Sequence, residues 1–193
     1  NREKLKTGWE TIKKNIKRVS DLTQDLLTYS KERKPEYELC DPNSIVQDLV
    51  ELVDEFAKSK GVTLTVQLDS GVGEISADPR TIHRSLLNLI NNGIDACLED
   101  EDTSKDHAIN IRTYQLTDTV CFEVKDNGCG MDQETRDQLF NPMFSTKGGK
   151  GTGLGLLVTG KLIEEHKGSI HVETNPGAGS SFTIQLPHDA ANA

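Results

Sequence analysis

The sequence predicts an α+β fold in which helices cover a mixed, largely antiparallel sheet, preceded by one long helix. Apolar residues recur every three or four positions in residues 5–26, as in a helix that packs along a seam. Strand patterns in residues 109–124 and 170–186 come in consecutive pairs, which favours antiparallel pairing. The 193 residues, 34% of them apolar, are enough for one sizeable domain and an appendage.

The distribution of charge marks a domain boundary near Pro35. Residues 1–34 carry 10 Lys and Arg against 5 Asp and Glu, whereas residues 35–193 carry 12 against 26, within a net charge of -9. We therefore expect residues 1–35 to form a separate helical region and residues 36–193 a globular domain. The acidic net charge argues against nucleic-acid binding, which needs basic patches.

The sequence contains no apolar run that approaches the roughly 18 residues of a membrane span. We expect a soluble region without membrane contact. Because the chain begins at Asn1 rather than Met, we expect a piece of a longer parent protein, and a membrane anchor upstream is compatible with this sequence. The cysteines are scattered, without metal-ligand spacing, which is typical of reduced thiols in a cytoplasmic protein: Cys40, Cys97, Cys121 and Cys129.

The first helix carries an apolar stripe that needs a partner. Leu22, Leu27 and Tyr29 widen the stripe, which favours a helix bundle over a two-stranded coiled coil. One helix cannot bury such a stripe alone, so we expect a homodimer through residues 2–34. The alternative is that the helix lies back on its own globular domain. The seam positions are Leu5, Trp9, Ile12, Ile16, Val19, Thr23 and Leu26.

Two Asp-Pro pairs and a series of alternating patterns define the elements of the globular domain. Asp41-Pro42 and Asp78-Pro79 each predict a helix start, with Asp as the cap and Pro in the first turn. Residues 98–107 are acidic, and we expect a surface loop with no chemistry of its own. The expected elements are strands at 37–40, 62–68, 75–77, 109–111, 120–124, 170–174 and 182–186, a helix with apolar positions at 45–56 that ends at Gly61, and helices at 79–97, 132–140 and 156–167, the last ending at Gly168.

Asn88 and Asn92 lie four residues apart on a predicted helix, so their amides share one face and can converge on one ligand. An Asn carbonyl oxygen is a suitable neutral ligand for a magnesium ion beside a triphosphate. The alternative is that both side chains satisfy buried backbone groups or face solvent.

Asp126 ends an apolar strand and precedes two glycines, so its carboxylate lies where the chain can turn tightly. A carboxylate there can accept a hydrogen bond from the exocyclic amine that distinguishes adenine from guanine. An ordinary Asp-Asn-Gly turn is the alternative.

Residues 148–155 are rich in glycine and run into a helix, an arrangement that lets backbone amides approach phosphates. Lys147 and Lys150 add positive charge. Gly149-Lys150 is followed by Gly151 rather than Ser or Thr, and the glycine spacing does not fit G-x-G-x-x-G, so neither a Walker loop nor a dinucleotide fingerprint is present. A flexible hinge remains the alternative.

Together these residues resemble the ATP-binding domain of sensor histidine kinases, within the GHKL superfamily that also holds Hsp90, DNA gyrase B and MutL. The resemblance covers residues 39–187 and implies a Bergerat-type sandwich. The variants at 92–96 and 142–147 are most similar to kinases of the nitrogen-regulation and oxygen-sensing type, although Gly93 departs from the usual Ala. Residues 88–96 are similar to the N box, 126–130 to the G1 box, 140–147 to the F box, 151–155 to the G2 box and 177–187 to the last hairpin.

The resemblance implies ATP and Mg²⁺ as cofactors and a role for each site residue. It makes Asn92 the magnesium ligand, with Asn88 supporting the phosphate region and Lys147 joining both in catalysis. Asp126 reads adenine, and residues 141–152 form the ATP lid. The implied ATP-binding residues are Asn88, Asn92, Asp95, Ala96, Asp126, Gly128, Gly130, Met131, Phe140, Phe144, Ser145, Thr146, Lys147, Gly151, Thr152, Gly153, Leu154, Gly155 and Ser181.

The resemblance further implies γ-phosphoryl transfer to a histidine on the first helix of a dimerisation hairpin. No histidine precedes His83, and residues 2–34 resemble the second helix of that hairpin. We therefore expect ATP binding without autophosphorylation, an acceptor helix elsewhere in the parent, and a response regulator as a further partner. Two alternatives stay open. A GHKL-type ATPase is disfavoured because hydrolysing members usually place Glu where this chain has Asn88, and a nucleotide-switched module without kinase activity fits the missing acceptor.

Overall fold

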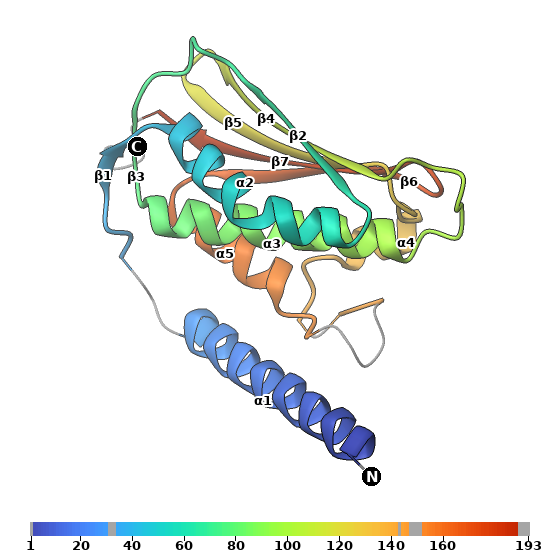
Figure 1. The fold of residues 1–193 in the computed structure, drawn as a ribbon. Coiled ribbons are helices and arrows are strands. Elements are labelled where there is room, and N and C mark those ends of the chain that lie inside the picture. Colours follow the sequence, from blue (N-terminus) through green and yellow to red (C-terminus); the bar gives the residue numbers. More distant parts are fainter. Residues whose placement is uncertain (1, 31–33, 143, 147–151, 189–193) are drawn as a thin grey trace.

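The computed structural model describes residues 2–30, 34–142, 144–146 and 152–188. They form a long helix followed by a layered domain, in which helices cover one face of a five-stranded sheet (Figure 1). In chain order the elements are α1 (Arg2–Ser30), β1 (Glu38–Cys40), α2 (Pro42–Ser59), β2 (Thr63–Leu68), β3 (Ile75–Ala77), α3 (Pro79–Leu98), β4 (Ala108–Leu116), β5 (Thr119–Asp126), α4 (Gln133–Gln138), α5 (Gly155–Glu165), β6 (Ser169–Asn175) and β7 (Gly179–Pro187).

The five-stranded sheet has the order β2-β4-β5-β7-β6, and only β2 and β4 are parallel. The other neighbours pair antiparallel, and β4 and β5 form a hairpin that closes at the pair Leu116 and Thr119. Parallel strands cannot be joined by a hairpin, and the connection between β2 and β4 includes α3. The predicted α+β class and the mixed, largely antiparallel sheet are confirmed. A separate two-stranded sheet joins β1 to β3.

The core lies between this sheet and helices α2, α3 and α5 (Figure 1). Alternate residues of a strand point to the same face, and in β5 the inward row is Val120, Phe122, Val124 and Asp126, all buried. The row therefore begins with apolar side chains and ends with a carboxylate. The alternation of β5 thus carries Asp126 to the edge of the core, beneath α3.

The two predicted helix starts are present with their caps. The Asp78 Oδ1 accepts hydrogen bonds from the backbone N–H groups of residues 80 and 81, and Pro79 follows as the first residue of α3. At the end of α5 the prediction is wrong. The helix stops at Glu165, and Lys167, not Gly168, takes a positive φ of 58°. Gly168 is instead required by close packing, because a Cβ there would lie 2.5 Å from the Gln185 backbone oxygen.

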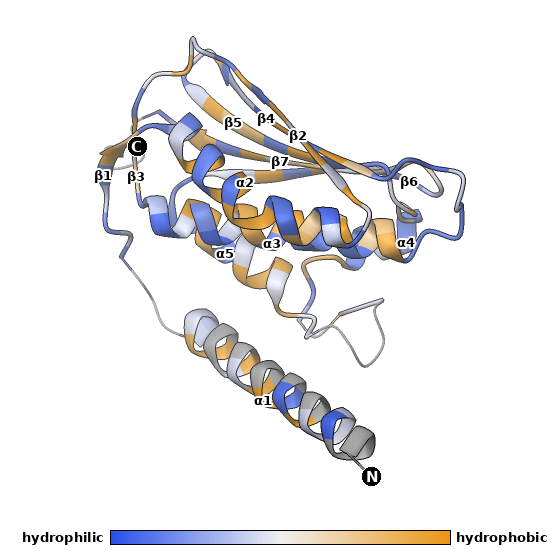
Figure 2. Cartoon of the chain, in the orientation of Figure 1, coloured by the Kyte–Doolittle hydropathy of each residue, from blue (hydrophilic) through white to orange (hydrophobic). Residues whose placement is uncertain are grey.

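Helix α1 contacts the sandwich through its last turn. The Arg84 guanidinium donates to Thr28 Oγ1 at 2.9 Å, and Lys161 Nζ donates to the Tyr29 carbonyl oxygen at 2.5 Å. Hydrophobic positions recur along the helix (Figure 2), and their side chains are exposed, Trp9 by 57% and Ile16 by 65%. In the described residues only the last turn of α1 lies against the domain, and the domain leaves the apolar side chains Trp9, Ile12, Ile16, Val19 and Leu26 exposed. No described helix has the length and apolarity to cross a bilayer.

Candidate functional site

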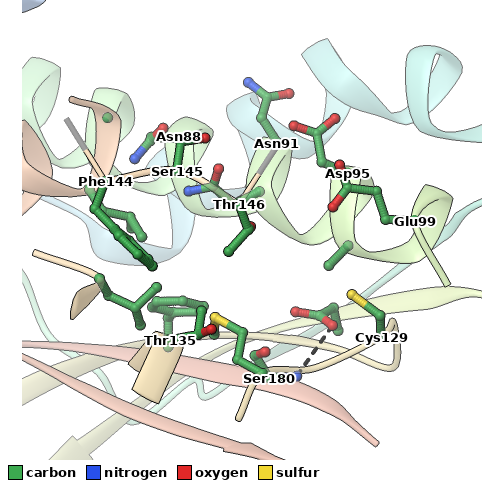
Figure 3. Close-up of a pocket in the computed structure, with 18 of the residues that line it drawn as sticks. Asn88, Asn91, Asp95, Glu99, Cys129, Thr135, Phe144, Ser145, Thr146 and Ser180 are labelled. Atoms are coloured by element: carbon green, nitrogen blue, oxygen red, sulfur yellow. Dashed lines mark hydrogen bonds between the residues drawn. The ribbon is translucent and has the colours of Figure 1, made fainter. Parts of the chain in front are cut away.

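A cavity of about 410 Å³ opens between α3, the loop after β5 and the start of α5. Its walls combine amides and carboxylates of α3, sulfur and glycine groups of the loop, and hydroxyls from several segments (Figure 3). The lining residues are Asn88, Asn91, Asn92, Asp95, Ala96, Glu99, Asp126, Cys129, Gly130, Met131, Thr135, Leu139, Phe144, Ser145, Thr146, Thr152, Gly153, Gly155, Leu156, Ser180 and Phe182.

Asn88 is fixed by the first turn of α5. Its Nδ2 donates to the Thr159 hydroxyl at 2.9 Å, and that hydroxyl donates to the Gly155 carbonyl oxygen at 2.9 Å. A Cβ at Gly155 would lie 2.6 Å from Asn88 Oδ1, so glycine leaves room for the Asn88 amide in its present position at the start of α5. The predicted amide face and the glycine loop thus meet at this point. Asn92, one turn further along α3, also lines the cavity.

Asp126 is held by backbone amides on one of its carboxylate oxygens. Oδ1 accepts from the N–H groups of Gly128 at 2.9 Å and Ser180 at 3.2 Å, and the residue is 4% exposed. Burial raises the pKa of this carboxyl above its ordinary value, while the two amide bonds and the nearby Lys105 act in the opposite direction. Both of these bonds end on Oδ1, so Oδ2 is the oxygen that a ligand can use.

The glycines of the 126–130 loop allow close packing against neighbouring segments. A Cβ at Gly128 would lie 2.5 Å from the Ala96 backbone carbon, so glycine lets the loop lie against α3. Gly130 has a φ of 63°, and a Cβ there would lie 2.0 Å from the Asn175 carbonyl oxygen. The loop is therefore clamped between α3 and the turn that joins β6 to β7.

Most of the predicted site residues line this one cavity, but four of those described do not. Gly128 packs under α3, and Leu154 is buried at the start of α5. Phe140 lies against Gly160 of α5. The prediction for Ser181 is wrong, because strand alternation turns its side chain to the opposite face of the sheet, where it donates to Glu123 Oε1 at 3.0 Å. Ser180 lines the cavity instead. Lys147 and Gly151, also predicted as site residues, lie outside the residues that the structure describes.

Several lining residues were missed by sequence reasoning. Glu99 continues the row of Asn88, Asn92 and Asp95 at spacings of four, three and four, so helical periodicity was a signal for it. Glu99 belongs to the acidic segment 98–107, and it brings one carboxylate of that segment to the cavity wall. Four of the others, Asn91, Cys129, Ser180 and Phe182, lie within the segments that carry the resemblance, and no comparable signal exists for Thr135, Leu139 and Leu156.

The four cysteines are free thiols, as predicted. Burial is the largest cause that raises the pKa of each, to about 12 for Cys97. A thiol with a raised pKa stays protonated near neutral pH, and the thiolate is the form that reacts and binds metals. Cys129 in the cavity wall therefore presents a neutral, polarisable surface to a ligand.

The sandwich and its cavity define a nucleotide-binding domain. A family model described as histidine kinase-, DNA gyrase B-, and HSP90-like ATPase matches residues 77–190, more than half of the chain. The chain belongs to this ATPase family, and ATP is its nucleotide.

Individual relatives point to one branch of the family. The chain is 32% identical over 177 residues to the signal transduction histidine-protein kinase AtoS of Escherichia coli K12, covering 91% of this chain and 28% of AtoS. It is 31% identical over 178 residues to the sensor histidine kinase ZraS of the same strain, covering 92% of this chain and 37% of ZraS. The chain thus spans only about a quarter to somewhat over a third of these curated relatives.

Solved structures agree with these sequence relatives. Histidine kinase ThkA, in a complex with response regulator protein TrrA, matches with a TM-score of 0.78 and 25% identity, covering 95% of this chain and 51% of ThkA. AdeS of Acinetobacter baumannii matches with a TM-score of 0.77 and 24% identity over 93% of this chain and 83% of AdeS, which shows the fold alone. The predicted resemblance to sensor histidine kinases is confirmed. The nitrogen-regulation and oxygen-sensing subtype stays a prediction.

Proposed function

We propose that this chain is the catalytic region of a two-component sensor histidine kinase, which transfers the γ-phosphoryl group of Mg-ATP to a histidine outside the chain. The observation that carries the proposal is the convergence of three different elements on one cavity: the Asn88 and Asn92 amides, the Asp126 carboxylate and the glycine-rich start of α5. AtoS and ZraS, both histidine kinases by name, support the same activity.

In this proposal the chain positions ATP and leaves the chemistry to the phosphate and the acceptor. Asn92 would hold Mg²⁺ through a neutral oxygen, as oxygen-preferring Mg²⁺ allows, and the bound ion would neutralise phosphate charge. Asp126 Oδ2 would accept from the adenine amine, and Asn88 would orient the phosphate region. The bond from the γ-phosphorus to ADP breaks as a bond to imidazole nitrogen forms. Neutral imidazole is already a nucleophile, so the chain needs no general base.

Hydrolysis is the less favoured activity because of Asn88. A carboxamide cannot take a proton from an attacking water, whereas a glutamate at this position could. The amide is also tied to Thr159 at 2.9 Å, which fixes its orientation. This arrangement fits a site that excludes water activation and passes the phosphoryl group to a stronger nucleophile.

The test supplies the missing acceptor. The chain is incubated with γ-labelled ATP and Mg²⁺, alone and with a separately prepared hairpin domain that carries an acceptor histidine. We expect acid-labile label on the added hairpin and none on this chain, and Asn92→Ala should abolish the transfer. Label on this chain alone would contradict an external acceptor. Release of free phosphate without transfer would support an ATPase, and binding with neither reaction would support a nucleotide-switched module.

The same proposal covers the assembly. Residues 1–35 would form half of a dimerisation bundle attached to a catalytic domain of residues 36–193, in a cytoplasmic part of the parent that passes phosphate to a response regulator. The exposed stripe of α1 supports this, because Trp9 and Ile16 are largely uncovered by the part of the chain that the structure describes. Light scattering at tens of micromolar should give a dimer, since a bundle interface of ordinary size holds at that concentration. A monomer would contradict the dimer.

A further inference from the structure

Lys105, in the segment between α3 and β4, reaches across to two other segments. Its Nζ lies 2.6 Å from Asp100 Oδ2 and 2.8, 3.3 and 3.5 Å from the backbone oxygens of Gly177, Asn127 and Gly128. The Lys105 side chain is 22% exposed and that of Asp100 is 7% exposed. An ammonium group has three hydrogens and no acceptor, so these oxygens occupy its full capacity, one hydrogen being shared. Lys105 is therefore a partly buried cross-link.

The two segments that Lys105 joins are the ones that hold Asp126. Gly128, whose carbonyl oxygen faces the ammonium, donates its N–H to Asp126 Oδ1. The turn after Gly177 leads to Ser180, which donates to the same oxygen. The segments also bond directly, because the Gly177 N–H donates to the carbonyl oxygen of residue 129 at 2.7 Å.

This junction concentrates negative groups in a small space. A Cβ at Gly179 would lie 2.1 Å from the Asp126 carbonyl oxygen, so the two backbones nearly touch. The carbonyl oxygens of Asn127, Gly128 and Gly177 converge on the Lys105 ammonium, whose positive charge offsets their mutual repulsion. The charge of Lys105 also favours the ionised form of the Asp126 carboxyl, whose pKa burial would otherwise raise further.

We propose that Lys105 is a positioning residue for nucleotide recognition, because its ammonium holds the loop after β5 against the β6–β7 turn and so fixes Asp126 in the cavity wall. The proposal rests on the proposed function through the role of Asp126 toward adenine. Lys105 is absent from the cavity lining, so it acts through Asp126 and does not touch the nucleotide.

The chain offers a matched control. Lys58 also lies 2.6 Å from a carboxylate oxygen, that of Asp54, but its side chain is 65% exposed and the pair lies one turn apart on α2. An exposed pair of this kind contributes little. Lys58→Met and Lys105→Met therefore remove the same charge and leave the same unbranched side chain. They differ in the lost contacts, since the Lys58 ammonium pairs with one carboxylate of its own helix and the Lys105 ammonium joins separate segments.

The experiment measures ATP affinity of the full chain by calorimetry in the presence of Mg²⁺. We expect Lys105→Met to bind ATP about tenfold more weakly, a coupling typical of residues that share one hydrogen-bond network, while Lys58→Met stays within about twofold. Lys105→Arg keeps the charge and should restore part of the affinity. Asp100→Asn keeps Oδ1, which accepts from the Asp102 N–H, but it removes the charge that pairs with Lys105. It should therefore also lower the ATP affinity, and it tests the proposal even if the Met variant is poorly folded.

A double-mutant cycle separates positioning from general damage. In the Asp126→Asn background, Lys105→Met should change ATP affinity by less than about twofold, because the group it positions is gone. An equal loss in both backgrounds, or unchanged affinity in both Lys105→Met and Asp100→Asn, would overturn the positioning role alone. Absence of ATP binding by the unmodified chain, or undiminished binding by Asp126→Asn, would overturn the proposed site and this inference with it.

Discussion

Replacing Asp126 by Asn changes one atom of a buried side chain and tests the centre of the site. The Asn Oδ1 can keep both backbone hydrogen bonds, from Gly128 and Ser180, so the loop should stay in place. The change converts Oδ2, the oxygen open to a ligand, into an amide NH₂. That group would face the amine of adenine, so an acceptor is exchanged for a second donor.

The size of the effect follows from the bond that is lost. A hydrogen bond to a charged group contributes about 1.5–3 kcal/mol, which corresponds to roughly 10- to 150-fold weaker ATP binding.

The stability of the Asp126→Asn variant should not fall. The pKa of Asp126 is raised in the folded chain above its ordinary value of 3.8. At a pH between 3.8 and this raised pKa, the native state therefore binds more protons than the unfolded state. Its contribution to stability therefore declines as pH rises through that window, and Asn removes this dependence.

Two measurements check the prediction. Calorimetry at about pH 7 gives the ATP affinity of both proteins, and thermal denaturation over a range of pH gives their stability. In the unmodified chain ATP affinity should also fall as pH drops through the raised pKa, because a protonated carboxyl loses its charge. Asp54→Asn on the exposed face of α2 is the control. Equal ATP affinity of the unmodified chain and Asp126→Asn would refute the adenine role. A marked loss of stability in Asp126→Asn would refute the argument that Asn keeps both backbone hydrogen bonds.

Three further predictions concern the fold and the assembly. Gly130→Ala should lower the free energy of unfolding by at least about 3 kcal/mol, because a Cβ would lie 2.0 Å from a backbone oxygen of β6. Gly177 has a similar φ of 73° but open space around it, so Gly177→Ala should lower the free energy of unfolding by only about 1 kcal/mol. Denaturant titration of both variants separates the effect of the clash from that of the positive φ. Ile16→Asp, at a residue 65% exposed, should shift the dimer towards monomer in light scattering without changing ATP affinity. His166→Leu should lower stability by about 1–3 kcal/mol, because its Nε2 accepts from the Asp78 N–H at 3.2 Å in the buried core; an unchanged melting temperature would argue against that bond.

The parts of the site that follow from local periodicity were predictable. Strand alternation brings Asp126 to the end of an inward row, and helical spacing brings Asn88, Asn92 and Asp95 to one face. The Asp-Pro pair at 78–79 begins the helix that carries them. These relations depend on residues within one element, so the sequence contains all the information that they need.

The contacts that join distant segments were not predictable in the same way. Whether Ser180 or Ser181 lines the cavity depends on the register of β7 against β5, and one position changes the face. The resemblance implies Gly128 as an ATP-binding residue, but in the structure glycine at this position allows the close approach to Ala96. Lys105 stands alone as a cation among acids, and its partners come from three segments that only the folded chain brings together.

Helix α5 touches both α1 and the cavity. At one end Gly155 borders the cavity, and two turns on Lys161 donates to the last turn of α1. Its 11 residues span about 16 Å as one hydrogen-bonded rod. If turning α1 alters how tightly ATP binds, then ATP must alter the free energy of turning α1 by the same amount. With such a coupling, nucleotide occupancy and the orientation of α1 would be reciprocal variables, and either one, when measured, would report on the other.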